Sequence, residues 1–211
     1  MINILDTNSI FIDFDGVIKE SVEVKSEAFE KLFLPFGKEI SKKVRNHHEL
    51  NGGMSRFEKL PIYFSFAGLQ VNQNLISDYS KKFSNLVITK VIDSNWVPGV
   101  KEFLKNNFEK INFFLITATP QKEIEEITKN LKIKRYFKSI IGSPTKKLNA
   151  IKDILYNYEL NPNESLMIGD SENDYLAAVD NMVPFILRKT NLNKKLQNQI
   201  NCQMIENFLY E

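Results

Sequence analysis

Short apolar runs alternate with stretches of helical period over much of the chain, and this alternation constrains the fold more than any other feature. The apolar runs are bounded by polar turn residues and are expected to be buried strands. They cover residues 9–14, 111–118, 137–142, 166–169 and 183–187. Helical patterns begin near Val97, after Pro120, after Pro144 and at Asp174. Such alternation predicts an α/β fold with three Rossmann-like layers, in which a parallel sheet carries helices on both faces.

Residues 19–93 interrupt this alternation and are predicted to form a helical insert. Apolar residues recur at helical spacing at Val24, Ala28 and Leu32, and again at Leu75, Tyr79 and Phe83. Within the insert, residues 86–92 are the first run with a strand pattern. We therefore predict an α/β core from residues 1–18 and 94–211, and a helical unit from residues 19–93. Residues 190–211 are expected to form a helix and a closing segment on the core.

The composition excludes several classes of protein. Lys and Arg number 28 against 26 Asp and Glu, so the net charge of +2 is too balanced for a dedicated nucleic-acid binder. The single Cys202 excludes an internal disulfide or a cysteine-based zinc site and fits a reducing compartment. No apolar stretch approaches the roughly 20 residues that cross a bilayer, and residues 1–8 lack the features of a signal peptide. We expect a cytoplasmic protein with no nucleic-acid or membrane partner, and its oligomeric state stays open.

Two aspartates stand together at the end of the first apolar run. Asp13 and Asp15 are two residues apart, and Gly16 then lets the chain turn. A period of two places both side chains on one face while the strand persists, and α/β sheets bind ligands at the carboxyl ends of their strands. Carboxylates so close repel one another unless a cation lies between them or one is protonated. The alternative is an ordinary strand end followed by an Asp-Gly turn.

A second acidic cluster follows the apolar run at residues 166–169. Asp170 and Asp174 flank the start of a predicted helix, and their spacing of four keeps both on one side. Carboxylates at one sheet edge suit Mg²⁺, which prefers carboxylates, waters and substrate phosphate. Asp170 by itself could merely cap the helix, but the acids at the end of the first run favour a metal site.

Hydroxyl and amino groups follow two further apolar runs. Thr117, with Ala118 beside it, stands where a strand leads into a helix, and its Oγ and nearby backbone N–H groups can hold a phosphate oxygen. Lys146 and Lys147 stand at the start of another predicted helix. A lysine there opposes the helix dipole, which favours a functional role for at least one of the two. The alternatives are a threonine cap and two solvated lysines.

These four segments, in this order, resemble the four motifs of the haloacid dehalogenase-like hydrolase superfamily over about residues 9–187. The resemblance implies that Asp13 is the nucleophile and Asp15 the general acid/base. It also implies a Mg²⁺ ion bound by Asp13, Asp170 and the backbone carbonyl of Asp15. Asp174 would support the metal shell or the lysine.

The same resemblance assigns the hydroxyl and the lysine. Thr117 would bind the phosphoryl oxygens, with Ala118 in support, and Lys147 or Lys146 would stabilise the transferring group. In close relatives the lysine follows Gly-Ser-Pro after two residues, which favours Lys147, although the doubled lysine leaves both open.

The insert resembles the small helical cap of the branch that contains β-phosphoglucomutase and phosphoglycolate phosphatase. Its Gly-Gly-Met-Ser-Arg at residues 52–56 resembles a stretch in which the arginine faces the active site and grips the far anionic group of the substrate. Arg56 is therefore a candidate substrate-binding residue and Lys25 a second one, the alternative for Arg56 being a solvated arginine at a helix start. His47 and His48, adjacent on a helix, point apart and are expected at the surface.

The resemblance implies a Mg²⁺-dependent phosphatase that acts on a small phosphorylated metabolite, such as a sugar phosphate, through an aspartyl-phosphate. A phosphomutase of the β-phosphoglucomutase type would use the same residues, but residues 119–121, Thr-Pro-Gln, occupy the stretch where that branch carries a lysine for a second phosphate. A dehalogenase would need neither Asp15 nor Asp170, and a non-catalytic binding protein would tolerate the loss of one of these groups. A compact cap leaves little room for a macromolecule, so a small phosphate ester is the expected partner.

Overall fold

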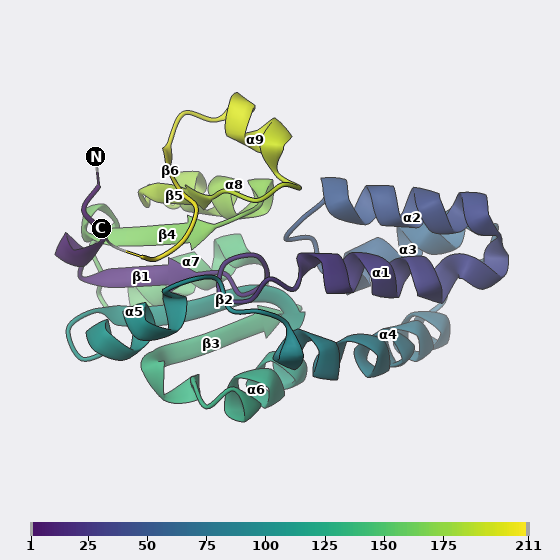
Figure 1. Cartoon of the computed structure of the whole chain (residues 1–211), viewed down its shortest axis with the longest axis horizontal. Coiled ribbons are helices and arrows are strands. Elements are labelled where there is room, and N and C mark those ends of the chain that lie inside the picture. The colour runs from purple at the N-terminus through teal and green to yellow at the C-terminus, as the bar shows by residue number, and fades with distance from the viewer. Residues whose placement is uncertain (1, 210–211) are drawn as a thin grey trace.

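The computed structural model describes residues 2–209, and its centre is a parallel sheet in the order β3-β2-β1-β4-β5-β6 (Figure 1). The strands are β1 (Ser9–Ile12), β2 (Asn112–Pro120), β3 (Phe137–Ser143), β4 (Ser165–Gly169), β5 (Phe185–Arg188) and β6 (Gln203–Ile205). Each neighbouring pair is parallel. The predicted α/β class with a parallel sheet is confirmed. The predicted core ranges include residues 1, 210 and 211, which lie outside the described residues.

Helices cover both faces of the sheet, as predicted (Figure 1). They are α5 (Val100–Asn107) and α6 (Gln121–Asn130) on one face and α7 (Lys147–Asn157) and α8 (Glu172–Asp180) on the other. Along β1, Ile10 and Ile12 join the apolar core beneath α5 and α6, while Phe11 joins the core beneath α7 and α8. Strands that are buried on both faces are continuous apolar runs in the sequence. This is why these strands could be predicted from the sequence.

The sheet ends in a strand that the sequence did not predict. The tail forms α9 (Lys194–Gln199) and then β6, which pairs with β5 at the sheet edge. All three residues of β6 are half-buried, so its apolar pattern is too weak to stand out. Short 3-10 helices cover Ile4–Asp6, Leu34–Phe36, Lys134–Tyr136 and Pro162–Glu164. No helix among residues 2–209 combines the length and the apolar character needed to cross a membrane.

Four helices of the insert lie beyond the carboxyl ends of the strands (Figure 1). They are α1 (Val22–Phe33), α2 (Lys38–Leu50), α3 (Arg56–Phe66) and α4 (Gln73–Asp93). The interpretation of residues 86–92 as a strand was wrong, because these residues form the last part of α4. Its β-branched residues favour strands in general, but Phe83, Val87 and Val91 recur every four residues and are all buried on the inner face of the helix.

The chain enters and leaves the insert at one place, where Lys19 holds the two crossings together. Lys19 forms a backbone bridge with Trp96, and its Nζ donates to the carbonyl of Ile92 at 2.9 Å and lies 4.5 Å from the centre of the Trp96 ring. These contacts join residues just before α1 to the last turn of α4 and to the segment that follows it. They fix where the insert begins relative to the sheet, while the predicted limits at residues 19 and 93 stay a prediction.

Candidate active site

The sequence-predicted residues of the core come from adjacent strand ends. Asp13 follows β1, Thr117 lies near the end of β2, and Asp170 follows β4. Because β2, β1 and β4 are neighbours in the sheet, their carboxyl ends meet at one edge, on the side of the insert (Figure 1). Lys147 reaches the same edge from the first turn of α7.

Three carboxylates gather at this edge. Asp13, Asp170 and Asp174 each offer one oxygen, and these oxygens all lie within 4.8 Å of one another. Two glycines leave the space for this approach. A Cβ atom on Gly16 would lie 2.2 Å from Asp170 Oδ2, and one on Gly169 would lie 2.3 Å from Asp174 Cβ. Since real Cβ atoms do not come so close, a side chain at either position would push the acids apart.

Lys147 lies among these acids, whereas Lys146 does not. The Nζ of Lys147 is 2.9 Å from Asp13 Oδ1 and 2.5 Å from Asp174 Oδ1, and its side chain is almost fully buried. The side chain of Lys146 is 73% exposed, and its Nζ lies 4.0 Å from Glu58 of the insert. Of the two lysines that the sequence left open, only Lys147 is placed to act on a group bound at the acids.

Burial and mutual repulsion perturb the ionisation of this cluster. Burial, together with the charges of Asp174 and Asp15, raises the pKa of Asp13 to about 7, although Lys147 opposes the shift. Burial and the neighbouring acids also raise the pKa of Asp170 well above its ordinary value. Burial by itself would lower the pKa of Lys147, but Asp13 and Asp174 outweigh it and raise that pKa. The lysine therefore stays charged, and one positive charge faces three carboxyl groups.

The cluster fits a divalent cation. Asp13 Oδ1 is buried and, within residues 2–209, accepts no hydrogen bond, although Lys147 lies within ion-pair distance. An orphaned carboxylate oxygen and acids whose pKa values are raised by their neighbours are both features that a bound cation would relieve. Asp174 is less available to a metal ion, because it accepts hydrogen bonds from Ser171 as well as from Lys147. Asp13 and Asp170 are thus the side chains best placed to hold an ion.

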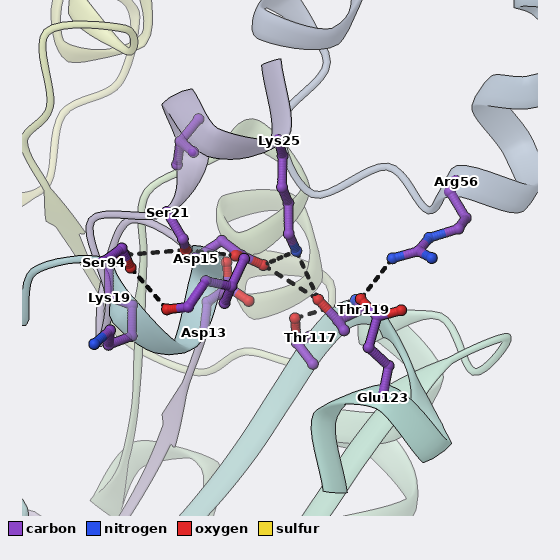
Figure 2. A network of polar contacts seen from close by, with 12 residues as sticks. Asp13, Asp15, Lys19, Ser21, Lys25, Arg56, Ser94, Thr117, Thr119 and Glu123 are labelled. Atoms are coloured by element: carbon purple, nitrogen blue, oxygen red, sulfur yellow. Dashed lines mark hydrogen bonds and ion pairs between the residues drawn. The ribbon is translucent and has the colours of Figure 1, made fainter. Parts of the chain in front are cut away.

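The carboxylate of Asp15 turns toward the insert, where Lys25 binds it (Figure 2). The Nζ of Lys25 donates to Asp15 Oδ2 at 2.5 Å, and Ser21 Oγ donates to Oδ1 at 2.6 Å. Burial would raise the pKa of Asp15, but the charge of Lys25 and these hydrogen bonds outweigh it and lower that pKa. Lys25 therefore contacts a catalytic candidate directly, and its role in binding substrate stays a prediction.

Thr119 completes this network and was not predicted as a site residue. Its Oγ1 donates to Asp15 Oδ2 at 3.2 Å and accepts from Lys25 Nζ at 2.8 Å, while its backbone N–H donates to Thr117 Oγ1 at 3.2 Å (Figure 2). The signal was present in the sequence, because two residues along a strand return to the same face.

A cavity of about 370 Å³ separates the strand ends from the insert. Its core wall includes Asp13, Asp15, Thr117, Ala118 and Asp170, and its insert wall includes Lys25, His48, residues 50–54, Arg56 and Lys59. This volume lies near the lower end of the range for small-molecule sites, which is about 300–1,000 Å³. Most of the predicted residues of the core and of the insert therefore face one small cavity. Lys147 contacts it through Asp13, whereas Asp174 and Lys146 do not line it.

Arg56 reaches the cavity, but a carboxylate of the core already neutralises it. Its Nη2 lies 2.7 Å from Glu123 Oε1 (Figure 2). Its Nη1 donates to Ser84 Oγ at 2.6 Å. The guanidinium also lies 4.5 Å from the centre of the Phe83 ring. The alternative of a solvated arginine is wrong, since the side chain is buried. A role in gripping substrate stays a prediction, and an anion there would share Arg56 with Glu123.

His48 is not a surface residue, which corrects the expectation from the sequence. It is buried on the insert wall of the cavity, and its ring centre lies 4.9 Å from that of Phe29. Its Nδ1 is 2.8 Å from the Nζ of Lys59, which is also buried. The neighbouring His47 is half-buried, with Nδ1 3.4 Å from the hydroxyl of Tyr63. The packing of α2 against α3 buries one histidine and the lysine together, and a helical pattern alone does not reveal this.

The chain is similar to one family of hydrolases and to known phosphatases. The family model described as haloacid dehalogenase-like hydrolase matches residues 10–187. The chain is 35% identical to the phosphoglycolate phosphatase of Vibrio vulnificus over 91 residues, and this match spans 40% of the length of either protein. It is 25% identical to the phosphorylated carbohydrates phosphatase of Thermotoga maritima over 183 residues, which cover 81% of this chain and 79% of that one.

A solved structure shares the whole fold. It is described as a predicted phosphoglycolate phosphatase from Haemophilus somnus, and it covers 98% of this chain and 96% of its own with a TM-score of 0.74. At 16% sequence identity, this likeness shows the fold and nothing finer.

Proposed function

Because the chain belongs to the haloacid dehalogenase-like hydrolases, we propose that it is a Mg²⁺-dependent phosphatase that hydrolyses a small phosphorylated metabolite. The observation that carries the proposal is the position of Lys147, between Asp13 and Asp174 and beside the strand ends. A buried cation next to a carboxylate nucleophile is what attack on a negatively charged phosphate ester requires.

The residues present can carry out the reaction in two displacements. Asp13 Oδ attacks phosphorus, the bond from phosphorus to the ester oxygen breaks, and Asp15 gives that oxygen its proton. Asp15 donates from its protonated form, which is the minor form at neutral pH because its pKa is lowered. Asp15 then takes a proton from a water, whose oxygen attacks phosphorus, and the bond between phosphorus and Asp13 breaks to release phosphate. Lys147 and the hydroxyl of Thr117 hold the phosphoryl oxygens throughout. Lys25, Ser21 and Thr119 fix the orientation of the Asp15 carboxyl group.

The acidic cluster would hold the metal. Asp13 and Asp170, with the backbone carbonyl of Asp15, are the proposed ligands, and Asp174 keeps Lys147 in place. When bound, Mg²⁺ neutralises charge on the phosphoryl oxygens and on the attacking carboxylate. The orphaned Asp13 Oδ1 supports this assignment.

The cavity supports a small substrate, and the surroundings of Arg56 support hydrolysis over a mutase reaction. A mutase must hold a second phosphate, whereas Arg56, the candidate for that contact, is already paired with Glu123. The named relatives act, by their names, on phosphoglycolate and on phosphorylated carbohydrates. We propose a substrate of this size class.

A phosphatase assay tests the proposal. The purified chain should hydrolyse p-nitrophenyl phosphate with Mg²⁺ and lose this activity in EDTA, and Asp13→Asn should lose it almost completely because the amide cannot attack phosphorus. The exposed Asp153→Asn on α7 is a matched control that should keep wild-type activity. Full activity in chelator, or Asp13→Asn activity within tenfold of wild type, would contradict the proposal, since tenfold is only about 1.4 kcal/mol of barrier.

A further inference from the structure

Three cations of the insert line the cavity, and Lys59 is the one without a carboxylate partner. Lys25 lies 2.5 Å from Asp15, and Arg56 lies 2.7 Å from Glu123. Within residues 2–209, the Nζ of Lys59 contacts only His48, at 2.8 Å from Nδ1 and 3.5 Å from the carbonyl oxygen. Lys59 is 2% exposed. A buried ammonium without a counter-ion is costly to keep in a folded chain.

Lys59 lies on the side of α3 that faces the cavity. Lys59 follows Arg56 by three residues on α3, so both point from one face of the helix. Lys25 and Asp15 are close enough to Lys59 to act on its ionisation. The cationic end of Lys59 thus belongs to the insert wall that faces the catalytic carboxylates.

We propose that Lys59, oriented by His48, binds a carboxylate of the substrate at the end opposite the phosphoryl group, so that the substrate is a small phosphorylated hydroxy acid. The inference rests on the phosphatase function proposed above. One uncompensated positive charge matches the single charge of a carboxylate, whereas a second phosphate would bring nearly two. The charges of Arg56 and Lys25 are already balanced by ion pairs with Glu123 and Asp15.

His48 prepares Lys59 for this contact. Burial and the charge of Lys59 lower the pKa of His48 well below its ordinary value, so the imidazole is neutral. Its Nδ1 accepts from Lys59, and the ring proton therefore lies on Nε2. Two donors of the ammonium group remain for other acceptors, one of them weakly engaged by the His48 carbonyl at 3.5 Å. A substrate carboxylate would give Lys59 the counter-ion it lacks.

The test compares two esters that differ in the carboxylate. The ratio of kcat/KM for 2-phosphoglycolate to that for ethyl phosphate is measured with Mg²⁺ in the wild type, in Lys59→Met and in Lys59→Gln. We expect the wild type to prefer 2-phosphoglycolate at least tenfold, and both variants to lose ten- to a hundredfold of this preference, because a charge-assisted contact is lost. Lys42→Met removes the same charge from an exposed position of α2 outside the cavity and should keep the wild-type ratio.

Each outcome decides the matter. A wild-type ratio near one, or a ratio in Lys59→Met and Lys59→Gln equal to that of Lys42→Met, would overturn the role of Lys59 while leaving the phosphatase function intact. If the wild type hydrolyses p-nitrophenyl phosphate but neither ester, the proposed substrate class is wrong. If it hydrolyses none of the three, the proposed function fails, and calorimetric binding of the same two esters then tests Lys59 separately. Tighter binding of 2-phosphoglycolate that is lost in the Lys59 variants would support the site, and equal binding of both esters would overturn it.

Discussion

The guanidinium of Arg56 and the carboxylate of Glu123 lie 2.7 Å apart, with side chains that are 4% and 5% exposed, and they join α3 of the insert to α6 of the core (Figure 2). Ser84 of α4 bonds to both, since Arg56 donates to its Oγ and this Oγ donates to Glu123 Oε2. The insert is therefore held to the core beside the cavity by a buried polar network. This network mainly fixes the position of the insert relative to the core, because burying an ion pair gains little net free energy of folding.

Breaking the pair from one side should destabilise the protein. Glu123→Gln leaves the buried charge of Arg56 without a counter-ion, and we expect the free energy of unfolding to fall by about 3–5 kcal/mol. The control is Glu126→Gln, at an exposed position of the same helix, which should change it by less than about 0.5 kcal/mol. Urea denaturation measures both. Equal stability of the two variants would show that Glu123 does not hold Arg56.

The two adjacent lysines offer a matched test of the core site. Lys147→Met removes the cation that contacts Asp13 and Asp174, and kcat/KM for p-nitrophenyl phosphate should fall by about 10²–10³ or more, as for other charge-stabilising donors. Lys146→Met removes an identical charge one residue earlier, from an exposed position, and should stay within about threefold of wild type. Comparable losses in both variants would contradict the assignment to Lys147.

Metal binding should appear in thermal stability, apart from any activity. Mg²⁺ at 100 times its dissociation constant should stabilise the fold by about 2.7 kcal/mol and raise Tm. Asp170→Asn should melt higher than wild type in EDTA, because it relieves repulsion among the three acids. It should also lose most of the gain from Mg²⁺. Asp180→Asn, exposed on α8, should behave as wild type in both conditions. A Tm that Mg²⁺ raises equally in all three proteins would place the ion elsewhere.

Much of the core could be predicted because its signals are local. Strands buried on both faces give continuous apolar runs, and polar residues directly after them mark the sheet edge, as at Asp13 and Asp170. The choice between Lys146 and Lys147 needed the structure, since one step around a helix start separates a buried side chain from an exposed one.

The insert was harder to predict because its buried polar groups depend on contacts between helices. Lys59 precedes Leu60 in an amphipathic pattern and would be taken for a solvated lysine, yet α2 places His48 against it. Arg56 was found from its motif, but its partner Glu123 lies 67 residues away in the sequence. The contact of Ser21 with Asp15 depends on turns of the chain that residue type alone does not specify, whereas Thr119 lies two residues from Thr117 on the same strand and could have been predicted.

The preference for a carboxylate should depend on pH through Lys59. Burial, and next the charge of Lys25, lower the pKa of Lys59 to about 7, while Asp15 and Glu58 oppose the shift and His48 is neutral. Below this pH the ammonium is charged and binds a carboxylate. Above it Lys59 is neutral, so the ratio of kcat/KM for 2-phosphoglycolate to that for ethyl phosphate should fall as pH rises from about 6 to 9.

The ratio isolates Lys59, because groups that act on both esters alike cancel and kcat/KM reports ionisation of the free enzyme. The substrate carboxylate itself stays ionised across this range. In Lys59→Met the ratio should be low and independent of pH, whereas in Lys42→Met it should follow the wild type. A ratio that falls with the same midpoint in Lys59→Met would assign the titration to another group, and a flat wild-type ratio would mean that Lys59 keeps its charge throughout.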